Sequence, residues 1–244
     1  MSMEFDPLAP KYLAWLIDGF WITLLLSLLA SLLGSALGLV LAVARSSPWA
    51  PLWRPAWAYI ALFRNTPLLV QLFFWYFGFT SLLPEELVLW LNAVHYLPLP
   101  GGRQWMLPGY EYLIGVVALG LFASAFIAEE IRAGLRGVPP SQRQAALALG
   151  MTPLQALTHV VLPQAVRIAL PPLLGQYMNV IKSSSLAMAI GVMELSYASR
   201  QVETATFKTF QAYAVSTVLY ILTIALLESV GQFLHRRTHA ALQP

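Results

Sequence analysis

The residues best suited to bind a polar ligand form the run NVIKSSS, which ends at Ser185 inside an otherwise apolar stretch. A lysine inside a membrane span is costly and is a functional candidate by default. For an anionic ligand, Lys182 would supply the counter-charge, and Ser183, Ser184 and Ser185 would supply hydroxyl donors. The alternative is that Lys182 extends its ammonium group to the membrane interface, or pairs with a neighbouring subunit. The run therefore predicts a polar binding site, with a structural role for Lys182 as the alternative.

A second polar group lies in the sequence RNTPLLVQ, which begins at Arg64. Pro67 suits the first turn of a helix, where its missing N–H has no intrahelical partner, and Thr66 is placed to cap that helix. Asn65, Thr66 and Gln71 are therefore candidates for contact with a substrate. The structural alternative, which we favour, is a helix start anchored by Arg64 on the positive side of a membrane.

Four charged residues, Glu129, Glu130, Arg132 and Arg136, lie within two helical turns of one another. Pairing of either glutamate with either arginine along one helix is the simpler interpretation. A part in closing a gate is the alternative.

The sequence carries no motif for catalysis. It has no G-x-x-x-x-G-K-[ST] phosphate loop, no G-x-S-x-G elbow and no H-E-x-x-H pair. Cysteine is absent, which excludes disulfides and thiolate metal sites. The histidines are isolated in sequence and are predicted to lie in loops or tails: His95, His159, His235 and His239. We therefore expect neither an enzyme nor a metal or cofactor site in this chain.

The amino-acid composition indicates that membrane-spanning helices position the polar residues described above. Hydrophobic residues make up 58% of the 244 residues and charged residues only 10%, with a mean hydropathy of +0.67. Soluble domains carry about 25% charged residues, so the chain is predicted to be an all-α integral membrane protein. Five windows are long and apolar enough to be transmembrane helices: 19–44, 57–79, 112–135, 168–192 and 210–234.

The orientation follows from the basic residues of the loops. The segments 45–64 and 132–167 and the C-terminal tail hold nine arginines, against four basic residues in the remaining loops. Because the basic side is cytoplasmic, the N terminus is predicted outside, the C terminus inside, and the loop at 80–111 outside. The net charge of +3 is small and gives no sign of nucleic-acid binding.

Small residues recur at every fourth position of the first window: Ala30, Gly34, Gly38 and Ala42. This spacing places them on one helix face, where another helix can approach closely. We expect packing within the chain, with a dimer contact as the alternative.

A helical segment too polar to span a membrane follows the third window. Pro139 and Pro140 block a straight continuation of the preceding helix, and a short helix is expected from Ser141 to Leu149. Gly150 suits the end of that helix because glycine adopts left-handed backbone angles at little cost.

A second short helix is expected after Gly150. Thr152 is placed to cap it, with Pro153 at the first position and Gln155 three residues after the cap. Pro163 is expected to end it. The product would be a helix–elbow–helix near the membrane surface.

The composition of this elbow favours a protein partner over lipid. Small residues at 145, 146 and 148 let another surface come close, as when a short helix docks in a groove. A helix lying on lipid would need a basic polar face and bulky anchors, but the elbow has one arginine and neither Trp nor Phe.

At this point a family resemblance becomes specific. The sequence QAALALGMTPLQALTHVVLPQA resembles the cytoplasmic coupling loop of ABC importer permeases, and the likeness extends over about 15–235. RNTPLLVQLFFWYFG, SAFIAEEIRAGLRGVP and IKSSSLAMAIGVMEL resemble the second-, third- and fourth-span segments of the polar amino-acid subfamily, most closely its glutamate/aspartate-type branch. The resemblance implies a single type I ABC importer permease domain over 1–244, with a coupling loop at about 139–164.

The same resemblance implies site residues and partners. The residues that would couple to the ATPase are Gln144, Ala145, Ala146, Gly150, Met151, Pro153 and Pro163. The expected partners are two copies of an ABC ATPase subunit, a second permease subunit that is identical or paralogous, a periplasmic or lipid-anchored amino-acid-binding protein, and membrane lipid. ATP and Mg would be bound by the ATPase, and the location would be the bacterial cytoplasmic (inner) membrane.

Two residues depart from the family pattern. Gln144 stands where relatives often have glutamate, so an ion pair there becomes a neutral hydrogen bond. Ser183 replaces an aspartate of the fourth-span segment, which removes a negative charge that would repel an acidic side chain. We therefore expect a polar, acidic amino acid as the transported substrate. The alternatives are an ion-gradient-driven secondary transporter, whose usual internal repeat the sequence lacks, and a non-transporting membrane scaffold.

Overall fold

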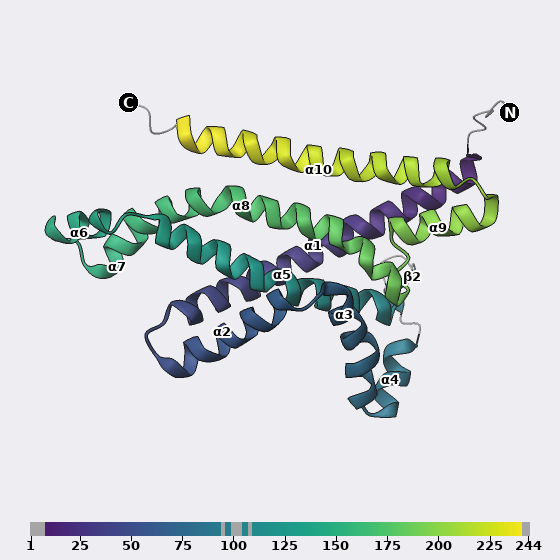
Figure 1. Ribbon diagram of the computed structural model, residues 1–244, viewed down its shortest axis with the longest axis horizontal. Coiled ribbons are helices and arrows are strands. Elements are labelled where there is room, and N and C mark those ends of the chain that lie inside the picture. Colours follow the sequence, from purple (N-terminus) through teal and green to yellow (C-terminus); the bar gives the residue numbers. More distant parts are fainter. Residues whose placement is uncertain (1–7, 94–95, 99–103, 107–108, 241–244) are drawn as a thin grey trace. The chain divides into compact units, whose positions relative to one another are not determined.

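The computed structural model describes residues 8–93, 96–98, 104–106 and 109–240, and the described chain is almost entirely helical (Figure 1). The α-helices are α1 (Pro10–Ser46), α2 (Ala50–Asn65), α3 (Leu68–Phe73), α4 (Glu85–Asn92), α5 (Tyr110–Gly137), α6 (Pro140–Ala148), α7 (Pro153–Gln155), α8 (Leu162–Ser183), α9 (Leu195–Thr206) and α10 (Thr209–Ala240). Two π-helical turns are η1 (Phe74–Phe79) and η3 (Ala156–Val161), and two 3₁₀ segments are η2 (Thr80–Leu82) and η4 (Ser184–Ile190). A small antiparallel hairpin pairs β1 (Tyr96–Pro98) with β2 (Gln104–Met106).

The chain forms two compact units. The first unit comprises Met1–Ala30, Thr66–Gly120 and Ile181–Tyr220. The second comprises Ser31–Asn65, Leu121–Val180 and Ile221–Pro244. The helices α1, α5, α8 and α10 each contribute residues to both units.

Four described helical stretches are long and apolar enough to cross a membrane: Pro10–Ser46, Tyr110–Gly137, Pro153–Ile190 and Thr209–Phe233. A shorter apolar helix runs over Leu68–Leu82. These elements confirm the all-α membrane fold.

The second window, 57–79, is not one continuous helix as predicted. The helix α2 ends at Asn65 and α3 begins only at Leu68, because a residue before proline is pushed out of the α region. Thr66 is that residue here, so the break follows directly from Pro67.

The fourth window begins earlier than predicted, and Pro163 does not end a helix. The segments α7, η3, α8 and η4 form one helical stretch, in which Pro163 lies in the first turn of α8. The π-helical turn of η3 ends two residues before that proline, and such turns accommodate a residue that lacks its own N–H donor.

In the first unit, α1 packs closely against α9. Leu16, Leu195 and Val202 are fully buried in the same cluster. A Cβ atom built on Gly19 would lie 2.8 Å from the Cβ of Ala198, so only glycine permits this approach. The helix α9 was not predicted, and it provides half of this core.

In the second unit, the small residues of α1 face α5. A Cβ atom on Gly38 would lie 2.8 Å from Ile127 Cγ2, and Ala42 packs with Ala128 and Ile60. Gly34 is buried as well, and so is Ala30, the last residue of the first unit's part of α1. For Gly38 and Ala42, the packing expected within the chain is confirmed.

Candidate functional site

The elbow after α6 is built around Gly150. This residue has φ of +85°, a left-handed conformation that glycine adopts without strain. The N–H of Gly150 donates to Leu147 O at 3.0 Å, and the N–H of Met151 donates to Ala146 O at 3.2 Å. These two bonds satisfy carbonyls at the end of α6 and turn the chain back sharply.

A reciprocal cap starts the second arm of the elbow, as predicted. The N–H of Gln155 donates to Thr152 Oγ1 at 3.3 Å, and the N–H of Thr152 donates to Gln155 Oε1 at 2.9 Å. Pro153 occupies the first helical position. The helix α6 then packs on η3, with Ala146 and Ala156 buried between them.

The outer surface of the elbow is apolar and exposed. Leu149 is 81% exposed and Leu154 is 69% exposed. Of the coupling residues predicted from the sequence, Ala146 is buried inside the elbow and Met151 is half-buried. The others are exposed: Gln144, Ala145, Gly150, Pro153 and Pro163. An exposed apolar surface of this kind is typical of a docking site for a partner.

The polar run at the end of α8 lines a cavity of the first unit. Its volume is about 280 Å³, and Lys182 and Ser185 contribute to its wall. Ser184 is buried and donates to Ile181 O at 2.7 Å, while Ser185 donates to Lys182 O at 2.7 Å. Ser183 is the last residue of α8 and does not line the cavity. The structure therefore supports two of the four predicted residues, Lys182 and Ser185, as cavity-lining groups.

The remaining wall of this cavity consists of hydroxyl-bearing residues that sequence reasoning missed. They come from α9 and α10: Ser196, Ser199, Tyr213, Ser216, Thr217 and Tyr220. The signal for them was present, since hydroxyl residues recur at spacings of three and four along each helix and so share one face. Lys182 is the one charged residue among the described lining groups.

A buried carboxyl group lies directly behind this wall. Glu194 Oε2 accepts hydrogen bonds from Tyr220 Oη at 3.0 Å and from Thr23 Oγ1 at 3.3 Å. Its Oε1 atom accepts the N–H of Tyr197 at 2.9 Å, which caps the start of α9. Burial is the main influence on this group and raises the pKa of Glu194, while the hydrogen bonds oppose that shift. Glu194 follows the span that ends at Ile190, and it joins three helices of the first unit.

The second predicted polar group holds a helix break. Gln71 Nε2 donates to Thr66 Oγ1 at 2.6 Å and to Thr66 O at 3.1 Å. The N-cap position of α3 is Pro67, so the prediction that Thr66 caps the helix is wrong by one residue. Asn65 belongs to the second unit and donates to Ala61 O at 2.7 Å. This geometry agrees with the structural interpretation of Asn65, Thr66 and Gln71.

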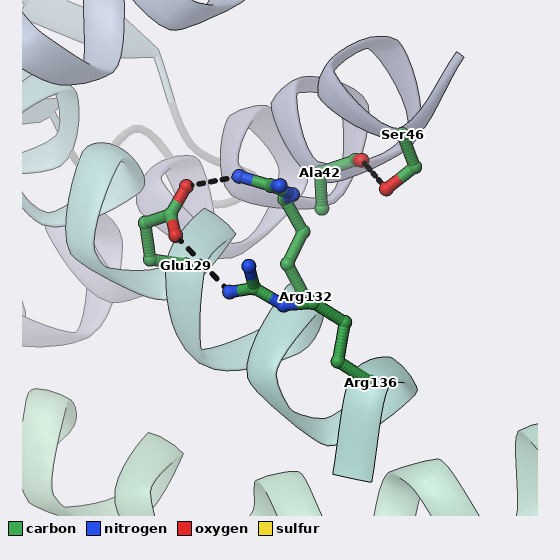
Figure 2. Close-up of polar contacts among 5 residues, drawn as sticks. All are labelled: Ala42, Ser46, Glu129, Arg132 and Arg136. Carbon is green, nitrogen blue, oxygen red and sulfur yellow. Dashed lines mark hydrogen bonds and ion pairs between the residues drawn. The ribbon is translucent and has the colours of Figure 1, made fainter. Parts of the chain in front are cut away.

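Figure 2 shows the charged group at the end of α5. Glu129 pairs with Arg132 and with Arg136, the latter at 3.6 Å. Glu130 instead accepts a hydrogen bond from Gln176 Nε2 at 3.2 Å, which joins α5 to α8. The predicted pairing along one helix is therefore confirmed, and Glu129 is the glutamate that makes it.

A multi-pass helical chain with an exposed elbow and a polar cavity, but without a nucleotide-binding motif, defines a membrane permease subunit. Residues 34–240 match the family described as "Binding-protein-dependent transport system inner membrane component". The chain belongs to this family.

Relatives and solved structures support the same family assignment. The chain is 32% identical over 226 residues to the "Glutamate/aspartate import permease protein GltJ" of Escherichia coli K12, covering 93% of this chain and 88% of that protein. It is 37% identical over 223 residues to the "Probable glutamine ABC transporter permease protein GlnM" of Bacillus subtilis 168, covering 91% and 92%. A chain of a solved "amino acid ABC transporter with histidines" superimposes with a TM-score of 0.78 at 31% identity, covering 93% of this chain and 95% of that chain. The MetNI methionine ABC transporter, at 20% identity and a TM-score of 0.73, supports the fold.

Membership of this family determines the role of the chain. It is the membrane-spanning permease subunit of an ABC importer, and it carries out no catalysis. ATP hydrolysis takes place in a partner ATPase subunit, and a substrate-binding protein is the other implied partner. The secondary transporter and the scaffold are not favoured.

Proposed function

We propose that this permease transports polar, acidic amino acids across the bacterial cytoplasmic membrane. The observation that carries the proposal is the cavity in which Lys182 is surrounded by hydroxyl groups. An ammonium group and hydroxyl donors are the groups that recognise carboxylates, because charge-assisted hydrogen bonds are the stronger ones.

The electrostatics of the cavity favour an anion. Lys182 is exposed to it, and no described carboxylate lines it. Glu194 lies behind Tyr220, and burial raises its pKa, which favours the neutral form. Ser183, in place of the family's aspartate, adds no negative charge. The relative named for glutamate and aspartate import supports the same substrate class.

A neutral polar amino acid is the second candidate. The relative named for glutamine supports it, because hydroxyl groups also bind an amide side chain. The side-chain carboxylate of an acidic substrate needs Lys182 as a counter-charge, whereas a neutral side chain needs this lysine less.

The elbow is the proposed site of coupling. Two ATPase subunits would each bind the elbow of one permease subunit, and the second permease would be an identical or paralogous chain. The exposed Leu149 and Leu154 would fill a groove of the ATPase, and Gln144 would contribute a neutral hydrogen bond. Nucleotide binding switches the pathway only where the elbow is bound more tightly in one conformation than in the other.

Lys182 is tested in the assembled complex, reconstituted in liposomes with its binding protein and ATPase. Loss of a hydrogen bond to a charged group costs about 1.5–3 kcal/mol, so Lys182→Met is expected to weaken uptake of glutamate and aspartate by roughly 10- to 100-fold. Lys182→Arg retains the charge and is expected to retain most of the uptake. Lys11→Met, at an exposed lysine of the same unit, is the matched control.

Competition by a panel of amino acids distinguishes the candidates. If glutamine and asparagine compete best and Lys182→Met leaves uptake unchanged, the acidic substrate is excluded. Normal uptake of glutamate by a Lys182→Met complex with full ATPase activity would dismiss the binding role of this lysine.

A further inference from the structure

A second cavity, in the second unit, carries more charged groups than the first. Its volume is about 510 Å³, and it lies among the ends of α1, α2 and α5. The charged groups that line it are four arginines and one glutamate: Arg45, Arg64, Arg132, Arg136 and Glu129. It is therefore strongly basic.

The positive charge of this cavity is only partly compensated. Glu129 pairs with Arg132 and Arg136 (Figure 2). The carboxyl group of Glu130 bonds to Gln176 instead. Among the described contacts, no carboxylate pairs with Arg45 or Arg64. These two guanidinium groups are therefore available to an anion.

Aromatic rings hold the two available arginines in place. The guanidinium carbon of Arg64 lies 5.3 Å from the ring centroid of Phe126, and that of Arg45 lies 5.5 Å from the ring of Trp53. Cation–π contacts of this kind orient a guanidinium group without neutralising it. In addition, Arg45 Nε is buried and makes no hydrogen bond to any described group. A buried donor without a partner is a costly feature that a bound anion would relieve.

We propose that this cavity binds the phosphate group of an anionic phospholipid. Planar guanidinium groups match the oxygens of phosphate in pairs, which makes arginine the preferred residue for such sites. The loops of this unit are the basic ones, which places the cavity at the cytoplasmic face, where basic pockets between helices bind lipid headgroups.

Tryptophans favour lipid over a soluble phosphate compound. Trp57 lines the cavity and is 54% exposed, and Trp49, at the start of the same helical hairpin, is 62% exposed. Exposed tryptophans are typical of the headgroup level of a membrane. The cavity thus opens at the level where a phospholipid phosphate lies.

The test uses the purified complex of permease and ATPase after removal of native lipid. Phosphatidylglycerol or phosphatidylcholine is added, and native mass spectrometry measures the lipid retained by each permease. Wild-type protein is expected to retain phosphatidylglycerol in preference to phosphatidylcholine. Each arginine near a headgroup contributes about fivefold in affinity, so Arg45→Gln and Arg64→Gln are each expected to weaken retention by about fivefold.

Arg54→Gln is the matched control, because Arg54 lies on the same helix α2 as Arg64, stacks on Trp53 and does not line the cavity. Equal retention of both lipids by wild-type protein would overturn the proposal, and this measurement needs no variant to fold. An equal loss in Arg54→Gln would do the same, since it would indicate general surface attraction. Displacement of phosphatidylglycerol by excess inorganic phosphate, with thermal stabilisation by phosphate alone, would assign the cavity to a soluble phosphate compound and overturn the lipid assignment.

Discussion

Substitution of Gly150 tests the effect of backbone strain on the elbow without a change in side-chain packing. A Cβ atom at Gly150 would meet nothing within 4 Å, so a larger residue creates no clash there. Its φ of +85° is nevertheless one that other residues adopt only with strain. Gly175, within α8, has the same open space around its Cβ position but no left-handed backbone. The two glycines therefore form a matched pair.

The expected size of the effect follows from this difference. A left-handed conformation costs a residue with a Cβ atom about 1–2 kcal/mol, whereas alanine in place of glycine inside a helix gains roughly 0.5–1 kcal/mol. The two alanine variants thus differ by about 2 kcal/mol, or roughly 30-fold in an equilibrium constant. Only Ala146 and Ala156 are buried in the elbow, so its local stability is low. The free-energy difference between the two variants therefore changes the fraction of molecules in which the elbow is folded.

The assay is ATPase activity stimulated by substrate-loaded binding protein, together with recovery of the ATPase on purification of the permease. Coupling is expected to fall in the order Gly150, Gly150→Asn, Gly150→Ala and Gly150→Val, because asparagine tolerates left-handed angles better than alanine and β-branched residues tolerate them least. Gly175→Ala is expected to retain full coupling. Normal uptake by Gly150→Val, or equal losses in the two alanine variants, would refute the reasoning.

Three further outcomes are expected, each from a different feature. In Gly134→Ala the new Cβ would lie 2.7 Å from the backbone O of Ala165, and in Gly38→Ala it would lie 2.8 Å from a side-chain methyl of Ile127. Overpacking costs about 1–3 kcal/mol, so both variants should unfold earlier in detergent, and Gly134→Ala should unfold first because backbone yields less than a side chain. The pKa of Glu194 is raised, so its contribution to stability is present below the ordinary carboxyl pKa and is lost as pH rises through the raised value. Unfolding followed between pH 4 and pH 9 should therefore depend less on pH in Glu194→Gln, and an unchanged pH dependence would contradict the burial argument.

The sequence was sufficient for features that depend on local chemistry. The left-handed Gly150 and the reciprocal cap of Thr152 and Gln155 both occur where residue types alone require them. The close packing at Gly38 likewise follows from small residues at every fourth position. In each case the physical cause lies within one or two helical turns.

Features that depend on distant contacts were not predictable. Glu194 accepts hydrogen bonds from Thr23 and Tyr220, which lie far from it in sequence, so its burial left no local signal. Glu130 bonds to Gln176 on another helix, although an arginine was closer in sequence. The spacing of the hydroxyl residues was visible in the sequence, but their position beside Lys182 was not, because α9 is too short and too polar to be recognised as a span.

Pro163 shows a second reason why the sequence did not predict the structure. Proline usually ends a helix, and the sequence gives no sign that the preceding turn is π-helical. The second arm of the elbow and the fourth span are consequently one helical stretch, Pro153–Ile190.

The central claim, that a separate ATPase binds the elbow, is tested most directly by cysteine labelling. The natural sequence contains no cysteine, so Leu149→Cys provides a single label at an 81% exposed position of the elbow, and Phe207→Cys provides one at a 91% exposed turn between α9 and α10. With a membrane-impermeant maleimide, Leu149→Cys is expected to react only from the cytoplasmic side and to be protected when the ATPase is bound, while Phe207→Cys reacts from the outside regardless of the ATPase. Labelling of Leu149→Cys from outside, or at an unchanged rate in the assembled complex, would contradict the account.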